Sequence, residues 1–185
     1  MDADKEFRAL FESAYPHIRR YALHRGLSAS DADDLVAATF EVAWCRFGEI
    51  PFAAPLPWLY AVAHNLWRNQ VRAEHRRGAL LNKLPTQVEV PPAAGEPAAL
   101  EAEALSRGLA ALSADDQEVL LLLAWDGLTP NEAAIVLGCT PSALRTRLRR
   151  ARDRLAAQLG IDRPRLRRRE VPQVGRQKTR DAIDG

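Results

Sequence analysis

Cysteine is scarce in this sequence of 185 residues: Cys45 and Cys139 are the only two. Neither has a second cysteine or a histidine at zinc-binding spacing, so the sequence predicts no metal site and no cofactor. We expect both to be small packing residues, Cys45 on an apolar helix and Cys139 in a turn. This sparing use of cysteine is typical of a reducing, intracellular compartment, and we predict a cytoplasmic protein.

Long apolar runs are missing as well. The first residues, MDADKEF, are charged and lack the apolar segment of a signal peptide, so we expect none. The longest apolar runs are far shorter than the ~20 residues of a membrane-spanning helix, which predicts no membrane insertion. The sequence also lacks a phosphate-binding loop and any clear Ser/His/Asp or Cys/His spacing, and its four histidines are scattered. An enzyme is therefore the least favoured class.

Charge is nearly balanced overall, at a net +2, but it is segregated along the chain. Residues 101–140 contain seven acids and a single basic residue, Arg107. Residues 141–169 contain eleven arginines and only two acids. A concentrated basic stretch can bind phosphates even when the whole protein is close to neutral.

The stretch 128–155 has the pattern of a helix-turn-helix. Its first helix carries a small apolar face that lets another helix approach closely, made of Ala133, Ala134 and Leu137. Gly138 is predicted to end this helix, Thr140 to cap the next one, and Pro141 to take its first position. The second helix has an apolar stripe of Leu144, Leu148, Ala151 and Leu155, with six arginines between them. This arrangement predicts a recognition helix with a cationic face.

Helical periodicity and the positions of proline and glycine predict an all-α fold of two small helical domains joined by a flexible Pro-rich linker. The second of these is the helix-turn-helix domain. The predicted boundaries are a first domain at 4–77, a linker at 78–97, a second domain at 98–159 and a disordered basic tail at 160–185. Within the first domain we expect helices at 4–25, 30–47 and 58–77, with a loop at 48–57 that contains three prolines.

The predicted helix at 58–77 combines amides, arginines and aromatic rings. Its polar face holds His64, Asn65, Arg68, Asn69 and Arg72, with Trp58, Tyr60 and Trp67 interleaved. Such side chains can contact bases and stack on them. Tryptophans at helical spacing are also typical of a packed core, so composition alone leaves both roles open for this helix.

Three stretches, taken together and in this order, resemble the extracytoplasmic-function (ECF) group of bacterial sigma-70 family sigma factors. DADDLVAATFEVAW (31–44) is similar to the family's helix that binds core RNA polymerase. PWLYAVAHNLWRNQVRA (57–73) is similar to its helix that reads and melts the −10 element. The segment 112–155 is similar to its −35-reading domain. The resemblance implies a sigma factor that directs promoter-specific transcription initiation and is not itself an enzyme.

The resemblance also implies residue roles and partners. The polymerase interface would include Asp34, Leu35, Phe40 and Trp44. The −10 element would face His64, Asn65, Arg68, Asn69 and Arg72. The −35 element would face Arg145, Thr146, Arg147, Arg149 and Arg150. The loop 48–57 would capture an unstacked base, and the expected partners are core RNA polymerase, promoter DNA and an anti-sigma factor.

Three residues depart from the family pattern, and two other classes of protein remain as alternatives. The family often has glutamine at Ala37, arginine at His64 and aspartate at Asn69, which bears on docking strength and −10 preference. One alternative is a stand-alone helix-turn-helix regulator, for which the helices starting near Asp31 and Trp58 would have no use. The other is a helical adaptor that binds only proteins, which the eleven arginines of 141–169 disfavour.

Overall fold

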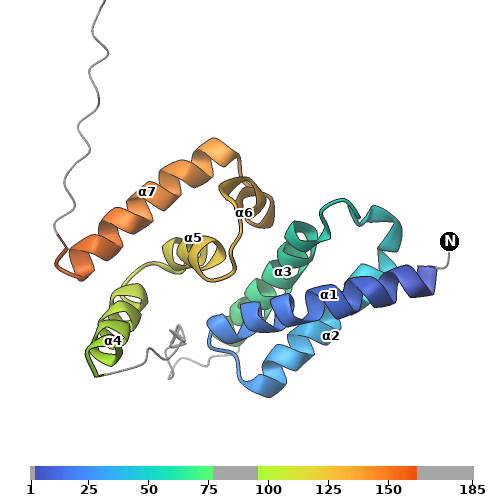
Figure 1. Cartoon of the computed structure of the whole chain (residues 1–185), viewed down its shortest axis with the longest axis horizontal. Coiled ribbons are helices and arrows are strands. Elements are labelled where there is room, and N and C mark those ends of the chain that lie inside the picture. Colours follow the sequence, from blue (N-terminus) through green and yellow to red (C-terminus); the bar gives the residue numbers. More distant parts are fainter. Residues whose placement is uncertain (1–2, 77–95, 162–185) are drawn as a thin grey trace, which may run out of the picture.

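Seven α-helices and one short 3-10 turn make up the regular structure of the residues that the computed structural model describes, 3–76 and 96–161. No strand occurs within these two ranges, which confirms the predicted all-α, two-domain fold. The predicted linker lies outside the described residues up to position 95, and the predicted tail lies outside them after position 161. Figure 1 shows two groups of helices lying side by side.

The N-terminal group consists of three helices that share one core. They are α1 (Ala3–His24), α2 (Ala29–Cys45) and α3 (Pro55–Arg76), with the 3-10 turn η1 (Phe47–Glu49) between the last two. Ile18, Tyr21, Leu59 and Tyr60 are among its largest fully buried side chains, and the two tyrosine rings lie 5.5 Å apart. The helical period predicted from the sequence therefore produces one continuous apolar core in this group.

The start of α2 and the role of Cys45 differ from the predictions. Ser28, not Ser30, is the N-cap, and its hydroxyl accepts a hydrogen bond from the Asp31 amide at 3.2 Å. Gly26, at φ 76°, makes the turn that brings Ser28 into position. Cys45 is exposed at the end of α2, so the prediction that it packs in the core is wrong.

The loop before α3 is shorter than predicted. Instead of an irregular segment up to residue 57, η1 occupies residues 47–49 and α3 already begins at Pro55. Proline is well suited to the first turn of a helix, because the amide it lacks would have no intrahelical partner there. Prolines 55 and 57 thus start the helix rather than prolong the loop.

The C-terminal group contains the remaining four helices. They are α4 (Glu96–Ala110), α5 (Ala114–Ala124), α6 (Pro130–Val136) and α7 (Pro141–Gln158). Thr129 and Glu132 form a reciprocal capping box at the start of α6. The predicted turn is confirmed: Gly138 has φ 60°, Thr140 caps α7 by accepting from the Ala143 amide at 3.2 Å, and Pro141 follows it.

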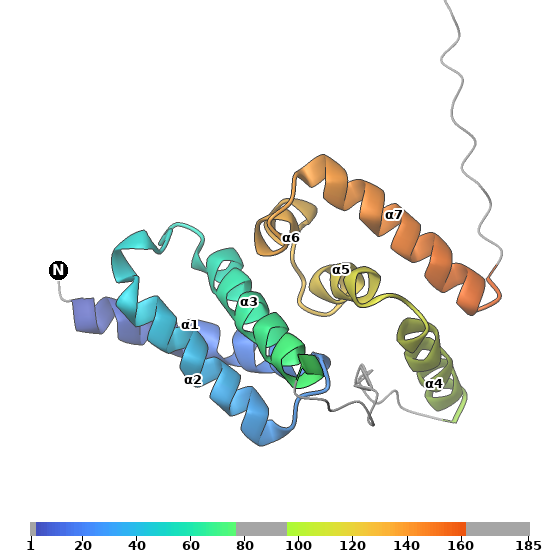
Figure 2. The same cartoon turned by 180° about the vertical axis from the view of Figure 1, so that it is seen from behind.

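The two groups of helices touch along α3 and α6. Figures 1 and 2 both show α6 lying against α3, and residues of these two helices approach closely. Ala133 and Ala134 of α6 are buried, as the small apolar face in the sequence predicted, and Cys139 packs against the same core. The contact between the domains places the predicted −10 helix beside the helix-turn-helix.

Candidate nucleic-acid interface

Helix α7 separates its apolar and cationic residues onto different faces. Leu144, Leu148 and Ala151 are buried, and Leu155 packs against the core, which confirms the predicted stripe. The predicted −35 residues lie away from this stripe. Arg145, Thr146, Arg149 and Arg150 are exposed and Arg147 is half-buried. The helix therefore offers an accessible cationic surface of the kind that enters a DNA groove.

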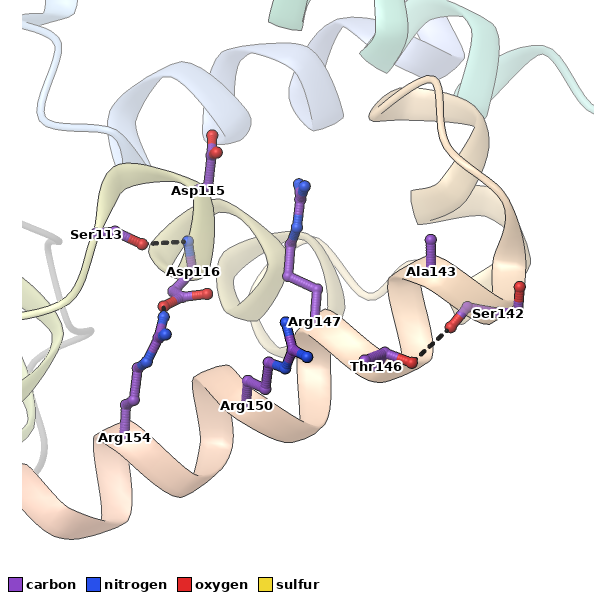
Figure 3. A pocket seen from close by; sticks show the side chains of 9 residues that line it. All are labelled: Ser113, Asp115, Asp116, Ser142, Ala143, Thr146, Arg147, Arg150 and Arg154. Atoms are coloured by element: carbon purple, nitrogen blue, oxygen red, sulfur yellow. Dashed lines mark hydrogen bonds and ion pairs between the residues drawn. The ribbon is translucent and has the colours of Figure 1, made fainter.

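A polar hollow of about 580 Å³ separates the start of α5 from α7 (Figure 3). Arg147 and Arg150 line it from α7, and Ser113 and Asp116 line it from α5. Asp116 forms an ion pair with Arg154 further along α7. That pair holds the two helices together at one end of the hollow. Within residues 3–76 and 96–161, no ion pair is formed by the side chains of Arg147 and Arg150. Both arginines remain able to bind a phosphate.

On α3 the predicted −10 residues divide into covered and open ones. His64 is only 4% exposed, whereas Asn65, Asn69 and Arg72 are exposed. Arg68 is half-buried, and its guanidinium lies 3.5 Å from the Asp115 carboxylate of α5. The five residues line one hollow of about 210 Å³, whose opposite wall is formed by residues 135–138. The structure thus brings the five predicted −10 residues together, but the hollow that they line faces the C-terminal domain.

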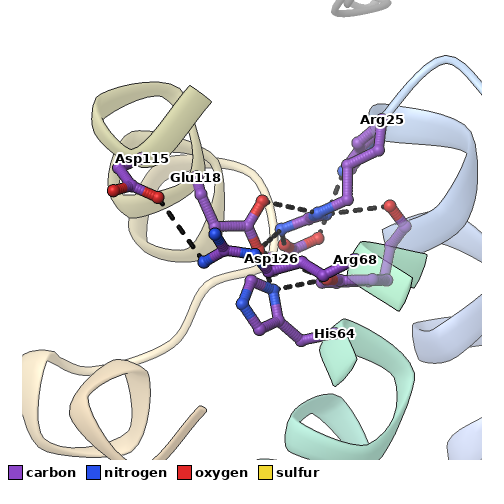
Figure 4. A network of polar contacts seen from close by, with 8 residues as sticks. Arg25, His64, Arg68, Asp115, Glu118 and Asp126 are labelled. Carbon is purple, nitrogen blue, oxygen red and sulfur yellow. Dashed lines mark hydrogen bonds and ion pairs between the residues drawn. The ribbon is translucent and has the colours of Figure 1, made fainter. Parts of the chain in front are cut away.

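A buried network of charges joins the two domains behind this hollow (Figure 4). Arg25, just after α1, donates from Nε and Nη2 to the two carboxylate oxygens of Glu118 on α5, both at 2.9 Å. Its Nη2 also donates to Asp126 at 3.1 Å. His64 Nδ1 lies 3.0 Å from the same Glu118 carboxylate. The side chains of Arg25 and Asp126 are fully buried, so these contacts are shielded from water.

Tyr21 and His24 complete the network from α1. The Tyr21 hydroxyl donates to Glu118 at 3.2 Å, and its ring lies under the Arg25 guanidinium, 3.4 Å from the ring centre. His24 Nδ1 lies 3.2 Å from Asp126. Every charged group in the network therefore has a partner of opposite charge or a hydrogen bond, as buried charges require.

The pKa values of two residues in the network reflect the balance between burial and the charges and hydrogen bonds around them. Burial alone would raise the pKa of Glu118, but the charge of Arg25 and the hydrogen bonds from His64 and Arg25 outweigh it and lower that pKa to about 2. Burial raises the pKa of the Tyr21 hydroxyl well above its ordinary value, despite the opposing charge of Arg25. Near neutral pH, Glu118 is therefore an anion and Tyr21 a neutral donor.

The predicted polymerase-binding residues on α2 also divide by exposure. Leu35 and Phe40 lie in the core, whereas Asp34 is exposed and Trp44 is 48% exposed. Trp44 packs edge-on against Phe7 with ring centres 4.9 Å apart, and Phe40 also contacts Phe7. The two buried residues fix the shape of this surface, and the two exposed ones are available to a partner.

The sequence predictions missed two residues of interest, Phe52 and Arg25. Phe52, in the short loop before α3, is 47% exposed, and its ring packs edge-on on Phe47 at 5.1 Å. An exposed phenylalanine in a loop expected to capture a base could have been noticed from the sequence. Arg25 could not, because its partner Glu118 is 93 residues away. The acidic bias of residues 101–140 was a signal for such a partner, but it did not indicate which basic residues would meet it.

Neither a metal-binding cluster nor a membrane-spanning helix is found in the described parts of the chain. Within residues 3–76 and 96–161, no group of three or more histidine, cysteine, aspartate or glutamate side chains is arranged to hold a metal ion. None of the helices in these ranges is long and apolar enough to cross a bilayer. The chemistry of the site is that of charge and hydrogen bonding.

The fold and this site define an all-α protein with two helical domains, the second of which is a helix-turn-helix domain with an exposed arginine-rich helix. Residues 10–77 match the family Sigma-70 region 2, and residues 102–155 match the family Sigma-70, region 4. The chain belongs to the sigma-70 family, in its extracytoplasmic-function group, and acts in transcription initiation.

Relatives and solved structures agree with this placement. The ECF RNA polymerase sigma factor EcfG of Rhodopseudomonas palustris is 31% identical over 156 residues, which cover 81% of this chain and 83% of that protein. The RNA polymerase sigma factor CnrH of Cupriavidus metallidurans is 32% identical over 151 residues, 74% of this chain and 78% of that one. Among solved structures, the sigma factor RpoE in complex with the anti-sigma factor NepR from Bartonella quintana is 27% identical, with a TM-score of 0.67 over 86% of this chain and 99% of that one.

Proposed function

We propose that this sigma factor binds core RNA polymerase through α2 and grips a promoter at two elements, the −35 element with α7 and the −10 element with α3. The observation that carries this proposal is the exposed arginine face of α7, held on a confirmed helix-turn-helix. A sigma factor of this kind lends sequence recognition to the polymerase and is not itself a catalyst. No cofactor is needed for that role.

In the −35 grip, α7 lies in the major groove. Arg145 and Arg149, one helical turn apart, are exposed and free to reach base edges. An arginine can donate two hydrogen bonds to guanine O6 and N7, and each good pair contributes about 1–3 kcal/mol of discrimination. Arg147 and Arg150, at the hollow between α5 and α7, hold phosphates and set the register. Thr146 lies on the helix surface between the two base-reading arginines and the two phosphate-binding arginines.

In the −10 grip, α3 and the loop before it hold an opened strand. Extruding a base costs a few kcal/mol of lost pairing and stacking. Stacking on an aromatic ring returns about 1–3 kcal/mol per base. Trp58 and Trp67 pack against the core, whereas Phe52 is exposed in the loop, so we assign the stacking role to Phe52. The amides and arginines from Asn65 to Arg72 then contact the neighbouring bases and phosphates.

The polymerase and the regulator are the protein partners of this role. Asp34 and Trp44 offer an exposed carboxylate and a half-exposed ring on α2, and the Trp44 ring packs against Phe7. The relative RpoE has been solved in complex with the anti-sigma factor NepR, and CnrH in complex with the cytosolic domain of CnrY. We infer that an anti-sigma factor also regulates this chain, and that the chain works in the cytoplasm with its polymerase.

The test is run-off transcription with purified core RNA polymerase, preceded by a pull-down. We expect the chain to bind core polymerase and to direct initiation from a duplex promoter. The double variant Arg145→Ala/Arg149→Ala should lose −35-dependent transcription and keep polymerase binding, because α2 is untouched. The matched control is Arg107→Ala, which removes an exposed arginine of α4. A chain that binds DNA without polymerase and cannot direct initiation would contradict the proposal.

A further inference from the structure

Arg154 differs from the other two arginines on its side of α7. Arg147, Arg150 and Arg154 follow one another at spacings of three and four residues, so they share one flank of the helix, and all three line the hollow toward α5. Among the described residues, Arg154 is the one of the three that forms an ion pair, with the carboxylate of Asp116 (Figure 3). The proposed function uses Arg147 and Arg150 to hold phosphates and gives this ion pair no role.

Asp116 is held firmly at the start of α5. Its amide donates at 3.3 Å to the hydroxyl of Ser113, which caps the helix. The next side chain, Gln117, is buried, and its Nε2 donates to the carbonyls of Leu109 and Leu112 at 2.8 and 3.2 Å. These bonds fasten the first turn of α5 to the end of α4 and to the connection between the two helices. The Asp116 side chain itself is only 5% exposed, so its carboxylate occupies a fixed place.

The apolar stripe of α7 and the ion pair constrain this helix in different ways. The buried side chains of Leu144, Leu148 and Ala151 attract the helix to the core, but the hydrophobic effect has no direction of its own. A charge-assisted hydrogen bond has a preferred geometry, and fixing a register is a well-attested use of charged groups in packed interfaces. The pair between Asp116 and Arg154 therefore limits both the rotation of α7 about its axis and its position along that axis.

We propose that Asp116 is a positioning residue for −35 recognition, because through Arg154 it fixes the rotation of α7. The helical period places Arg145 and Arg149 on the opposite side of the apolar stripe from Arg154, so a turn at one flank moves the other. A rotation of about 20° moves a group about 6 Å from the axis by about 2 Å, which is enough to break a hydrogen bond to a base. This inference rests on the proposed −35 role of α7.

The two partners of the pair have opposite charges, which separates positioning from a simple effect of charge. Asp116→Asn removes an anion near the DNA and should raise the affinity for any sequence, whereas Arg154→Gln removes a cation and should lower it. If the pair positions α7, both variants lose discrimination between sequences all the same. The quantity to compare is the ratio of two affinities, one for a duplex that the unmodified chain selects from a random pool and one for a scrambled duplex of the same base composition.

The measurement is fluorescence anisotropy with the full chain at one fixed salt concentration. We expect each single variant to lower the ratio about tenfold, within the range that one lost arginine–guanine pair costs. The double variant Asp116→Asn/Arg154→Gln should lower it no further, because both changes remove the same interaction. Asp116→Glu keeps a carboxylate for Arg154 and should hold the ratio within about threefold of its unmodified value. Circular dichroism checks that each variant is folded, and Arg154→Gln, at an exposed side chain, carries the test if Asp116→Asn is not.

The matched control is Asp115→Asn. Asp115 belongs to the same turn of α5 and lines the same hollow, but its carboxylate is turned away from Arg154 in Figure 3 and lies near Arg68 instead. This variant should raise the affinity for both duplexes and leave their ratio within about twofold. A ratio that stays unchanged in either folded variant of the pair, or that falls equally in Asp115→Asn, overturns the positioning role of Asp116.

The same ratio in Arg145→Ala/Arg149→Ala reports separately on the proposed function. If this double variant keeps the full ratio, α7 does not read bases and the proposed −35 role fails. If it loses the ratio while the variants of Asp116 and Arg154 keep theirs, the −35 role stands and the positioning role alone is refuted.

Discussion

Helices α3 and α7 carry similar side chains but differ in what lies opposite them. Both are amphipathic and both display arginines beside hydroxyl or amide groups. The face of α7 is open to solvent, whereas the face of α3 is opposed by α6 and by the acids of α5. The composition of a helix therefore predicts what it can bind, but its neighbours in the fold decide whether that face is accessible.

The largest expected effect is a loss of stability in the C-terminal domain, which holds α7. Leu144 of α7 is fully buried in the C-terminal core, and Leu144→Ala should cost about 2–5 kcal/mol of unfolding free energy. Thermal unfolding followed by circular dichroism should show an early transition of the C-terminal helices, with the α1 to α3 core melting later. Arg145→Ala, its exposed neighbour, serves as the control and should leave the melting temperature within a degree or two. A single unchanged transition in Leu144→Ala would show that the two cores are not independent.

A second prediction tests whether the polar face of α7 is more accessible to DNA than that of α3. In the free chain, Arg149→Ala should weaken binding to a duplex selected by the chain from a random pool by about 1–3 kcal/mol, because this arginine is exposed on α7. Arg68→Ala should change the same affinity less than twofold, because Arg68 faces Asp115 rather than solvent alone. Fluorescence anisotropy at one fixed salt concentration measures both. Equal losses in the two variants would mean that α3 is as accessible as α7.

Low pH should weaken the contact that covers α3 and so reduce the difference in accessibility between α3 and α7. The pKa of Glu118 is lowered to about 2 where the two domains are in contact, against an ordinary value of 4.5. Because this pKa is depressed, the stabilisation that Glu118 gives to the contact between the domains is fully present above pH 4.5 and is lost as the pH falls toward 2. Tyr21 from α1, Arg25 just after it, His64 from α3 and the nearby Asp126 all face this carboxylate.

The measurement is the distance between spin labels on the native Cys45 and on Ala157→Cys, in a Cys139→Ser background, as the pH is lowered from 5 to 3. We expect the short-distance population to fall over this interval while circular dichroism still reports helix. In Glu118→Gln the distribution should start more open and should change much less with pH, because the titrating group is gone. A steeper change in Glu118→Gln than in the unmodified chain would assign the acid effect to another group.

The smallest expected effect concerns α6, the helix that covers α3. Thr129 accepts from the Glu132 amide at 3.3 Å, and the Glu132 carboxylate accepts from the Thr129 amide at 2.8 Å. Thr129→Ala removes the hydroxyl from this capping box and should cost about 1 kcal/mol. Hydrogen exchange should quicken at the first amides of α6, with α7 unaffected. Thr146→Ala on α7 is the control, because its hydroxyl bonds within a helix and caps no end.

Most of the secondary structure could be predicted from the sequence because its causes are local. The turn at Gly138, the cap at Thr140 and the buried stripe from Leu144 to Ala151 each depend on residues within a few positions of one another. The errors are local as well: Ser28 displaced Ser30 as a cap, and the prolines at 55 and 57 began a helix instead of extending a loop. In each case two nearby residues were both suitable, and the geometry of the adjacent turn selected one.

The candidate site could be predicted only in part. The exposure of the α7 arginines could be predicted, because an amphipathic helix fixes which side chains share a face; their role at the −35 element stays a prediction. The covering of His64 and the pairing of Arg68 with Asp115 could not be found in the same way. They depend on how one domain sits against another, and helical periodicity contains no such information.

By itself, the sequence determined the helices, the helix-turn-helix and its cationic face, since these follow from spacing, capping residues and apolar periodicity over short distances. Only the tertiary structure decided that Arg25 and Glu118, 93 residues apart, would share a buried ion pair, and that α3, the helix proposed to read the −10 element, would be the covered one. The physical reason is that the energy of a buried charge depends on which opposite charge the fold brings within 3 Å of it. That partner is set by the packing of domains and by no local pattern of residues.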